Sequence, residues 1–287
     1  MAPDAPVTFK GWVACDKTAA EGNLVFTEFA AKPFTDDDVD IKITHCGVCA
    51  SDIHTLRSGW GETDYPIVVG HEIVGFVVRK GNNVTDLEIG DRVGVGAQCD
   101  SFLNCDLCSN GKEPYCSDHV YTYGSRFADS AKSQGGYAEY GRYPASFAFK
   151  IPDSIPSEIA APLFCGGATV YSPLKANGAG PGKTVGIVGI GGVSFYAISR
   201  SRSKESDARA MGATDFIATS ENGWLEKNMR SLDLIVCTAN DTSIPMSQNL
   251  MLLKVGGKLV QVGAPEGGLP SFDLFPLLFN QASYRSR

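Results

Sequence analysis

Short segments that alternate between apolar and polar residues, or run β-branched, dominate the first half of the chain. Residues 38–44, 67–78 and 90–95 are of this kind, and turns rich in Gly, Asn or Asp separate them. Long helical periodicity does not occur in this half. We therefore expect an irregular β-barrel over residues 1–155, with its cysteine and histidine residues on loops.

The pattern changes near Pro152 and Pro156. Residues 157–174 begin like a capped helix, with Glu158 directly behind Ser157. Further on, residues 203–213 are typical of a helix, and apolar strand-like runs occur at 184–189, 193–199, 233–239 and 256–263. This alternation predicts a parallel α/β sheet, a doubly wound domain over residues 156–287.

One connection in this second half is too short. Gly189-Ile190-Gly191-Gly192 follows a β-branched run, as in dinucleotide-binding turns that open a helix and hold pyrophosphate at its N-terminus. Here Val193 starts the next strand-like run at once, whereas adjacent parallel strands need a crossover of about a dozen residues or more. A tight Gly-Gly hairpin is one interpretation. We favour a parallel sheet whose crossover helix is missing from this chain, together with a tail beyond residues 281–284.

Composition excludes several classes of function. The 287 residues are 43% hydrophobic and 20% charged, as in ordinary globular proteins of about two domains. A net charge of -7 argues against nucleic acid as a partner, and there is no apolar run of the length that spans a membrane. The N-terminus lacks the basic and apolar regions of a secretory signal, so we expect a cytoplasmic protein.

Cysteine usage points to metal. The chain has nine cysteines, an odd number, and four of them lie between Cys99 and Cys116. In a cytoplasmic protein such a cluster binds metal more often than it forms disulfides. Elsewhere Cys49, His71 and Cys165 could supply the three ligands that a catalytic zinc takes, leaving its fourth position for substrate. Each alone has a plainer interpretation, a buried thiol or a solvated imidazole.

Several motifs in order resemble the zinc-dependent medium-chain alcohol dehydrogenases. The resemblance is greatest to the cinnamyl-alcohol-dehydrogenase-like branch, which includes fungal NADP-dependent enzymes. The motifs are CGVCASDIH, GHEIVG, DRVGVGAQ, SQGGYAEY, APLFCGGATVYSPL and GPGKTVGIVGIGG. This resemblance implies a GroES-like catalytic barrel followed by a Rossmann-type domain, and a homodimer joined through edge strands of the cofactor domains.

The resemblance also implies roles for individual residues. Cys49, and not Cys46, matches the zinc ligand, as do His71 and Cys165, while the adjacent acid that can approach the metal is matched by Glu72. A proton relay to the substrate oxygen is implied at Ser51 and His54, and Ser51 also borders the cofactor. Asp52 resembles the acid that positions groups around the metal, although a turn-capping role is an open alternative.

A second zinc is implied by the spacing of Cys105, Cys108 and Cys116, which match three ligands of the family's structural zinc loop. The first ligand of that loop should stand at position 102, where this chain has Phe102. A closed tetrahedral site needs four ligands. We therefore expect Cys99, three residues upstream, to supply the fourth thiolate.

The expected cofactor is NADPH, held in part by the glycines 189, 191 and 192. An acidic residue at the end of the second strand would accept the ribose hydroxyl of NAD. This end instead carries hydroxyls and cations, which suit a 2′-phosphate, at Ser199, Arg200, Ser201, Arg202 and Lys204. A solvated basic turn is the alternative.

The substrate wall is expected at Trp60 and Tyr121, where the family lines its pocket, although both could be ordinary packing aromatics. The leading hypothesis is reversible, zinc- and NADPH-dependent reduction of aromatic or medium-chain aldehydes. The alternatives are reduction of a conjugated alkene or an iminium, and a non-catalytic remnant that binds zinc or nucleotide without turnover.

Overall fold

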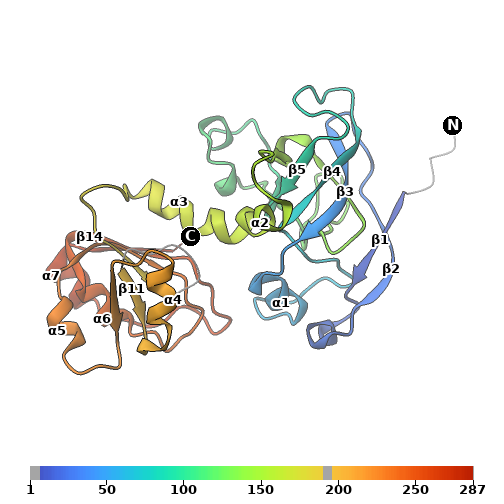
Figure 1. Ribbon diagram of the computed structural model, residues 1–287. Helices are drawn as coiled ribbons and strands as arrows, with labels where there is room; N and C mark the ends of the chain where they lie inside the picture. Colours follow the sequence, from blue (N-terminus) through green and yellow to red (C-terminus); the bar gives the residue numbers. More distant parts are fainter. Residues whose placement is uncertain (1–6, 190–195, 287) are drawn as a thin grey trace, which may run out of the picture. The chain divides into compact units, whose positions relative to one another are not determined.

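The computed structural model describes residues 7–189 and 196–286 (Figure 1). The chain forms two compact units, Met1–Ala168 and Thr169–Arg287. The first unit extends past the boundary expected at residue 155 because helix α2 (Ser157–Pro162) packs against two strands of the barrel. No helix among the described residues is long and apolar enough to cross a membrane.

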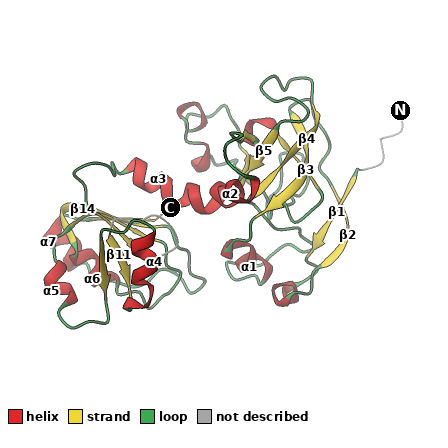
Figure 2. Ribbon diagram, in the orientation of Figure 1, coloured by secondary structure: helices red, strands yellow, loops and turns green. Residues whose placement is uncertain are grey.

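The first unit is built on a five-stranded antiparallel sheet (Figure 2). Its strands, in order across the sheet, are β8 (Tyr140–Pro144), β3 (Asp38–Cys46), β4 (Ile73–Lys80), β5 (Arg92–Val95) and β9 (Phe149–Lys150). Two further pairs are β1 (Thr8–Val13) with β2 (Val25–Ala30), and β6 (Gln98–Asp100) with β7 (Val120–Tyr121). The short helices are η1 (Lys17–Glu21), α1 (Ala50–Leu56), η2 (Cys108–Asn110), η3 (Glu113–Tyr115) and η4 (Ala145–Phe147).

The core of this barrel lies between the strands that the apolar pattern predicts. Val39, Ile41, Ile73 and Val93 are fully buried in one cluster. The predicted strands at 38–44 and 90–95 are confirmed as β3 and β5, whereas the 67–78 segment becomes a strand only from Ile73. The barrel-like β fold is thereby confirmed.

The second unit is a six-stranded sheet, parallel throughout. Its order is β12 (Asp215–Ala218), β11 (Tyr196–Ser199), β10 (Val185–Val188), β13 (Leu232–Cys237), β14 (Leu253–Gln261) and β15 (Ser283–Ser286). The helices are α3 (Ala168–Ala176), η6 (Arg202–Lys204), α4 (Glu205–Ala210), α5 (Trp224–Asn228), α6 (Met246–Met251) and α7 (Phe275–Asn280). The predicted parallel α/β sheet is confirmed.

Both faces of this sheet are covered, as the unbroken apolar character of its strands requires. Ile235 and Leu259 face Leu250 of α6 in one cluster, and α7 packs on the same side. Val236 and Val185 belong to a separate cluster that includes Leu174 of α3. Because successive side chains of a strand point to opposite faces, β13 contributes to both layers.

The short connection after β10 joins parallel strands. Gly186 lies opposite Tyr196, and Val188 lies opposite Ile198, in parallel register. The hairpin interpretation is therefore wrong, because a hairpin would make the two strands antiparallel. Gly191 and Gly192, expected to hold the cofactor, lie outside the described residues.

Candidate active site and metal centres

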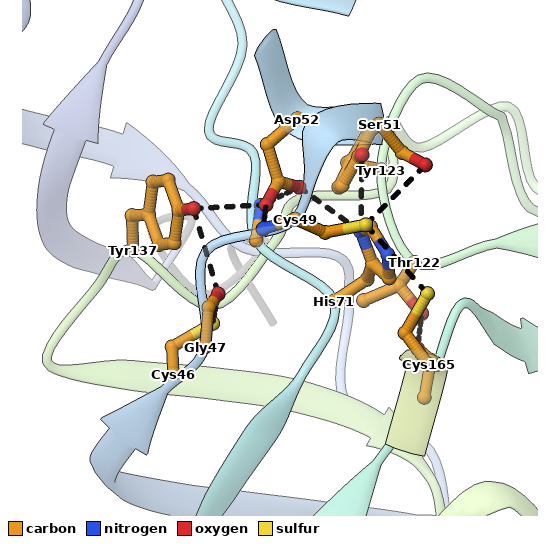
Figure 3. A network of polar contacts seen from close by, with 12 residues as sticks. Cys46, Gly47, Cys49, Ser51, Asp52, His71, Thr122, Tyr123, Tyr137 and Cys165 are labelled. Atoms are coloured by element: carbon orange, nitrogen blue, oxygen red, sulfur yellow. Dashed lines mark hydrogen bonds and ion pairs between the residues drawn. The ribbon is translucent and has the colours of Figure 1, made fainter. Parts of the chain in front are cut away.

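Two thiols and an imidazole converge in the first unit from three separate segments (Figure 3). Cys49 follows β3 and stands at the N-cap of α1, and His71 precedes β4. The pairing of β3 with β4, in which Cys46 lies opposite Ile73, brings these two segments together. With Cys165, the three ligand atoms lie within 4.8 Å of one another.

The spacing of the sulfurs fits a shared tetrahedral zinc. The Cys49 and Cys165 sulfurs are 3.8 Å apart. Two thiolates at about 2.3 Å from one tetrahedral ion would be separated by about 3.8 Å. Two thiolates and one neutral imidazole form the donor set of a catalytic zinc with one open position, so the residues present fit this metal.

Cys165 reaches the site from a single π-helical turn, η5 (Leu163–Gly167), between α2 and α3. Such turns interrupt helices at functional sites because they shift one residue out of the regular spiral. Phe164 packs so closely on Gly94 of β5 that a Cβ on Gly94 would collide with the Phe164 ring.

The expected helix cap at Ser157 is wrong. Pro156 is the N-cap residue of α2, and the Ser157 hydroxyl accepts a hydrogen bond from Arg92.

Asp52 organises the groups around the candidate metal site. Its carboxylate accepts hydrogen bonds from Nδ1 of His71 at 2.9 Å, from the backbone N–H of Cys49 at 2.9 Å and from that of Gly70 at 3.1 Å. The hydroxyl of Tyr137 donates to it at 2.8 Å. With its proton held on Nδ1, His71 presents Nε2 as a metal ligand. Asp52 therefore has both roles considered for it: it caps the turn through the Cys49 N–H and positions the His71 imidazole.

The electrostatics distinguish the two cysteines of the CGVC motif. The neighbouring Cys165 thiol lowers the pKa of Cys49 to about 3 against the opposing effect of burial, with help from His71 and Ser51. Burial raises the pKa of Cys46 to about 12. For His71, burial lowers the pKa, but the hydrogen bonds to Asp52 and Cys49 outweigh it and raise it to about 9. A metal ion that binds Nε2 therefore displaces a proton from that nitrogen and leaves the imidazole neutral. Cys49 is thus ready to serve as a thiolate ligand, and Cys46 is a neutral thiol.

The expected relay residues lie on α1, beside Cys49. The Ser51 hydroxyl is 3.5 Å from the Cys49 sulfur. His54 follows three positions later, so it shares a helix face with Ser51, and it is buried. The Trp60 ring lies against His54, with ring centroids 4.6 Å apart, while Trp60 itself is half exposed.

Glu72 is buried next to His71 but is not a member of the group formed by Cys49, His71 and Cys165. Its carboxylate accepts a hydrogen bond from the Gly166 backbone, and a Cβ on Gly47 would collide with it. Burial and the negative charge of Cys49 raise the pKa of Glu72.

Two tyrosines in the site escaped the sequence analysis. The Tyr123 hydroxyl lies 3.0 Å from Nδ1 of His71, and Tyr137 binds Asp52. Tyr137 belongs to the SQGGYAEY motif and could have been identified as a site residue from it, whereas no motif in the sequence includes Tyr123. Tyr121, expected in the substrate pocket, is half exposed, and its ring contacts His119.

A second thiol cluster forms from Cys105, Cys108 and Cys116, whose sulfurs also lie within 4.8 Å of one another. Cys99 does not join them, contrary to the prediction. It is fully buried in the barrel core, and its thiol donates to the carbonyl oxygen of Tyr121. The cause is strand geometry: Cys99 occupies the inward face of β6.

The expected 2′-phosphate residues lie at the end of β11 and in η6. Arg200 and Lys204 are exposed. The Arg202 guanidinium, by contrast, forms ion pairs with Glu221 and with Glu205. Gly189, the first glycine of the predicted turn, has a φ of +87°, and a Cβ there would collide with the Thr238 hydroxyl. Both its conformation and its surroundings therefore require glycine.

Comparison with known families agrees with both units. Residues 35–153 match the model of the alcohol dehydrogenase GroES-like domain, and residues 184–286 match that of the zinc-binding dehydrogenase. The fold and site thus define a zinc-dependent dehydrogenase of two units. The chain belongs to the zinc-dependent medium-chain alcohol dehydrogenase family, in its cinnamyl-alcohol-dehydrogenase-like branch.

Named relatives are found in fungi and plants. The chain is 50% identical over 256 residues to NADP-dependent alcohol dehydrogenase 6 of Saccharomyces cerevisiae, covering 84% of this chain and 71% of the relative. It is 39% identical over 289 residues to cinnamyl alcohol dehydrogenase 3 of Arabidopsis thaliana, covering 94% and 75%.

Solved structures show the same arrangement of elements. A cinnamyl alcohol dehydrogenase from Sorghum bicolor superimposes with a TM-score of 0.89 at 34% identity, covering 98% of this chain and 83% of that one. The CAD from Helicobacter pylori, complexed with NADP(H), gives a TM-score of 0.87 at 30% identity, covering 98% and 84%.

Proposed function

We propose that this protein reduces aldehydes to primary alcohols with NADPH and zinc, reversibly, and that its substrates are aromatic or medium-chain aliphatic. The observation that carries the proposal is the Cys49, His71 and Cys165 trio, in which Asp52 fixes the tautomer of His71. The NADP-dependent yeast relative supports the choice of cofactor.

The residues divide the chemistry among them. Bound zinc would act as a Lewis acid toward the aldehyde oxygen, and bound NADPH would supply the hydride. Cys49, His71 and Cys165 hold the metal, and Asp52 keeps the imidazole oriented. Ser51 donates its hydroxyl proton to the carbonyl oxygen of the substrate as the hydride reaches the carbonyl carbon, and His54, on the same face of α1, passes in a proton from solvent that restores the Ser51 hydroxyl. Glu72 would approach the metal from beside Gly47.

The second unit, which contains the parallel sheet, recognises NADPH. Ser199, Arg200, Ser201 and Lys204 offer hydroxyls and exposed cations for a 2′-phosphate. Arg202 already forms ion pairs with Glu205 and Glu221, so its main role is to stabilise this loop. Direct contact with the phosphate then comes mainly from Arg200 and Lys204. Gly189 permits close approach of the backbone to the cofactor.

The cysteines of the CGVC motif allow a matched test. Cys49→Ala should lose NADPH-dependent aldehyde reduction together with one zinc per chain, because a metal ligand is removed. Cys46→Ala, three residues away, should keep both, because Cys46 is a neutral thiol that contacts the Gly47 carbonyl. Retention of turnover by Cys49→Ala, or its loss only in Cys46→Ala, would refute the assignment.

The second candidate function is a remnant that binds zinc or nucleotide without turnover. It is favoured by one observation, that seven residues separate the parallel strands β10 and β11. A zinc-loaded protein that fails to oxidise NADPH with any aldehyde would support it. Reduction of conjugated alkenes or iminium compounds is less favoured, because Ser51 and His54 provide a proton relay suited to a carbonyl oxygen.

The proposal extends to the oligomeric state of the protein and its location in the cell. We infer a homodimer formed through the second unit, because its edge strand β15 is neighboured in sequence by the exposed apolar side chains of Leu274, Phe275, Leu278 and Phe279. Cytoplasmic location is supported by the chemistry of the thiols: all nine cysteines are free, and thiolate ligands persist in reducing compartments.

A further inference from the structure

The thiol cluster in the loop after β6 has the dimensions of a tetrahedral metal site. The Cys105 sulfur is 3.4 Å from that of Cys108 and 3.8 Å from that of Cys116. Thiolates that share one zinc are separated by about 3.8 Å. The three sulfurs, all within 4.8 Å of one another, are thus spaced to provide three ligands of one tetrahedral zinc, and the fourth ligand decides how firmly such a metal is held.

Backbone N–H groups already surround these sulfurs. The N–H of Cys108 lies 3.5 Å from the Cys105 sulfur. The N–H of Leu103 donates to Cys108, and that of Phe102 donates to Cys116. Such donors stabilise thiolates that bind metal. The backbone of Phe102 and Leu103 thus lies directly against the cluster.

Neither Phe102, which stands at the family's ligand position, nor the expected Cys99 can supply the fourth ligand. The Phe102 side chain has no ligand atom, and 58% of it is exposed. Cys99 is 0% exposed, packs in the barrel core and donates a thiol hydrogen bond to the Tyr121 carbonyl oxygen. A different residue, or water, must complete the site.

Ser101 has both the position and the chemistry. It is buried, and its hydroxyl oxygen is 3.5 Å from the Cys108 sulfur. An oxygen at about 2.0 Å and a thiolate at about 2.3 Å from one tetrahedral zinc would be about 3.5 Å apart. We propose that Ser101 supplies the fourth ligand, so that this zinc is held by three thiolates and one serine oxygen.

The consequence is a zinc that exchanges more readily than one in a four-thiolate site, because a serine oxygen is a poorer zinc ligand than a thiolate. This inference concerns the loop of the first unit and does not depend on catalysis at the other trio. Zinc release from the Cys105, Cys108 and Cys116 cluster and turnover at the Cys49, His71 and Cys165 trio are measured separately, so failure of one proposal leaves the other standing.

The test uses the whole chain, not the isolated loop, and follows the transfer of zinc to a chromogenic chelator. Ser101→Ala should release this zinc at least about tenfold faster than the unmodified protein, and Ser101→Cys should release it at least about tenfold more slowly. Cys99→Val is the matched control and should leave the rate unchanged. His71→Ala removes the metal of the other trio and so identifies which release phase belongs to which site.

Cadmium-113 NMR of the cadmium-substituted protein identifies the donors directly. The cluster resonance should lie in the region of three sulfurs and one oxygen, and Ser101→Cys should move it to the four-sulfur region. An unchanged release rate in Ser101→Ala, with an unmoved resonance in Ser101→Cys, would overturn the proposal. So would faster release from Cys99→Val, or the absence of any metal at the cluster.

Discussion

Oδ1 of Asp52 lies 2.9 Å from Nδ1 of His71, and both side chains are almost completely buried. Asp52 also accepts a hydrogen bond from the Cys49 backbone, so one carboxylate orients the His71 imidazole and anchors the segment that carries Cys49, two of the proposed zinc ligands. A carboxylate on the far nitrogen of a metal-bound histidine fixes its tautomer and increases its basicity.

Asp52→Asn should therefore lower zinc affinity at the Cys49 trio by about 10- to 100-fold. Competition with a zinc-buffering chelator measures it. Tyr137→Phe, which removes only one hydrogen bond to the same carboxylate, is the control and should have a smaller effect. Equal zinc affinity in Asp52→Asn and the unmodified protein would contradict the positioning role.

The sheet of the second unit predicts a dependence of stability on pH. Burial tends to raise the pKa of Asp233, but Lys254 at 2.7 Å and the Thr184 N–H at 2.9 Å outweigh it, so the folded pKa lies below the ordinary value. A carboxylate with a depressed pKa adds stability above its unfolded pKa, and that stability disappears as the pH falls through the folded pKa.

Asp233→Asn should thus lower the free energy of unfolding at pH about 7, and the difference from the unmodified protein should shrink below pH about 4. Denaturant titrations of both proteins at the two pH values provide the measurement. A difference that stays constant, or grows, in acid would show that Asp233 is not stabilised as an anion.

Cofactor choice should follow the exposed cations of the second unit. Arg200→Ala and Lys204→Ala should each raise the KM for NADPH by about tenfold, equivalent to about 1.4 kcal/mol, and should hardly change that for NADH. Arg202→Ala should discriminate less, because its guanidinium already binds Glu205 and Glu221. Equal increases in the KM for NADPH and for NADH in Arg200→Ala and Lys204→Ala would contradict the assignment of these residues to the 2′-phosphate.

Substrate preference should depend on Trp60 more than on Tyr121. Trp60 lies against His54 of the proposed relay, whereas the Tyr121 ring contacts His119. Trp60→Ala should raise the KM for an aryl aldehyde relative to a short aliphatic one, since an aromatic wall is lost. The same substitution at Tyr121 serves as comparison. Unchanged ratios in Trp60→Ala would remove this residue from the pocket.

Much of this organisation could be predicted from the sequence, because β-branched runs define buried strands and Cys49, His71 and Cys165 stand in motifs. The failures have local causes. Spacing alone suggested Cys99 as a ligand, but the alternation of β6 turns its thiol into the core. Tyr123 reaches His71 only through folding, and Asp215–Ala218 is too short to be distinguished as a strand.

The most direct test of the central claim is zinc reconstitution of activity. Protein stripped of metal is titrated with zinc while NADPH oxidation by an aromatic aldehyde is recorded, with His71→Ala as a parallel sample that keeps only the thiol cluster of Cys105, Cys108 and Cys116. We predict that activity rises with occupancy of the Cys49 trio and that His71→Ala stays inactive at full loading of the cluster. Full occupancy of both sites without NADPH oxidation would contradict the reductase assignment and favour the non-catalytic remnant.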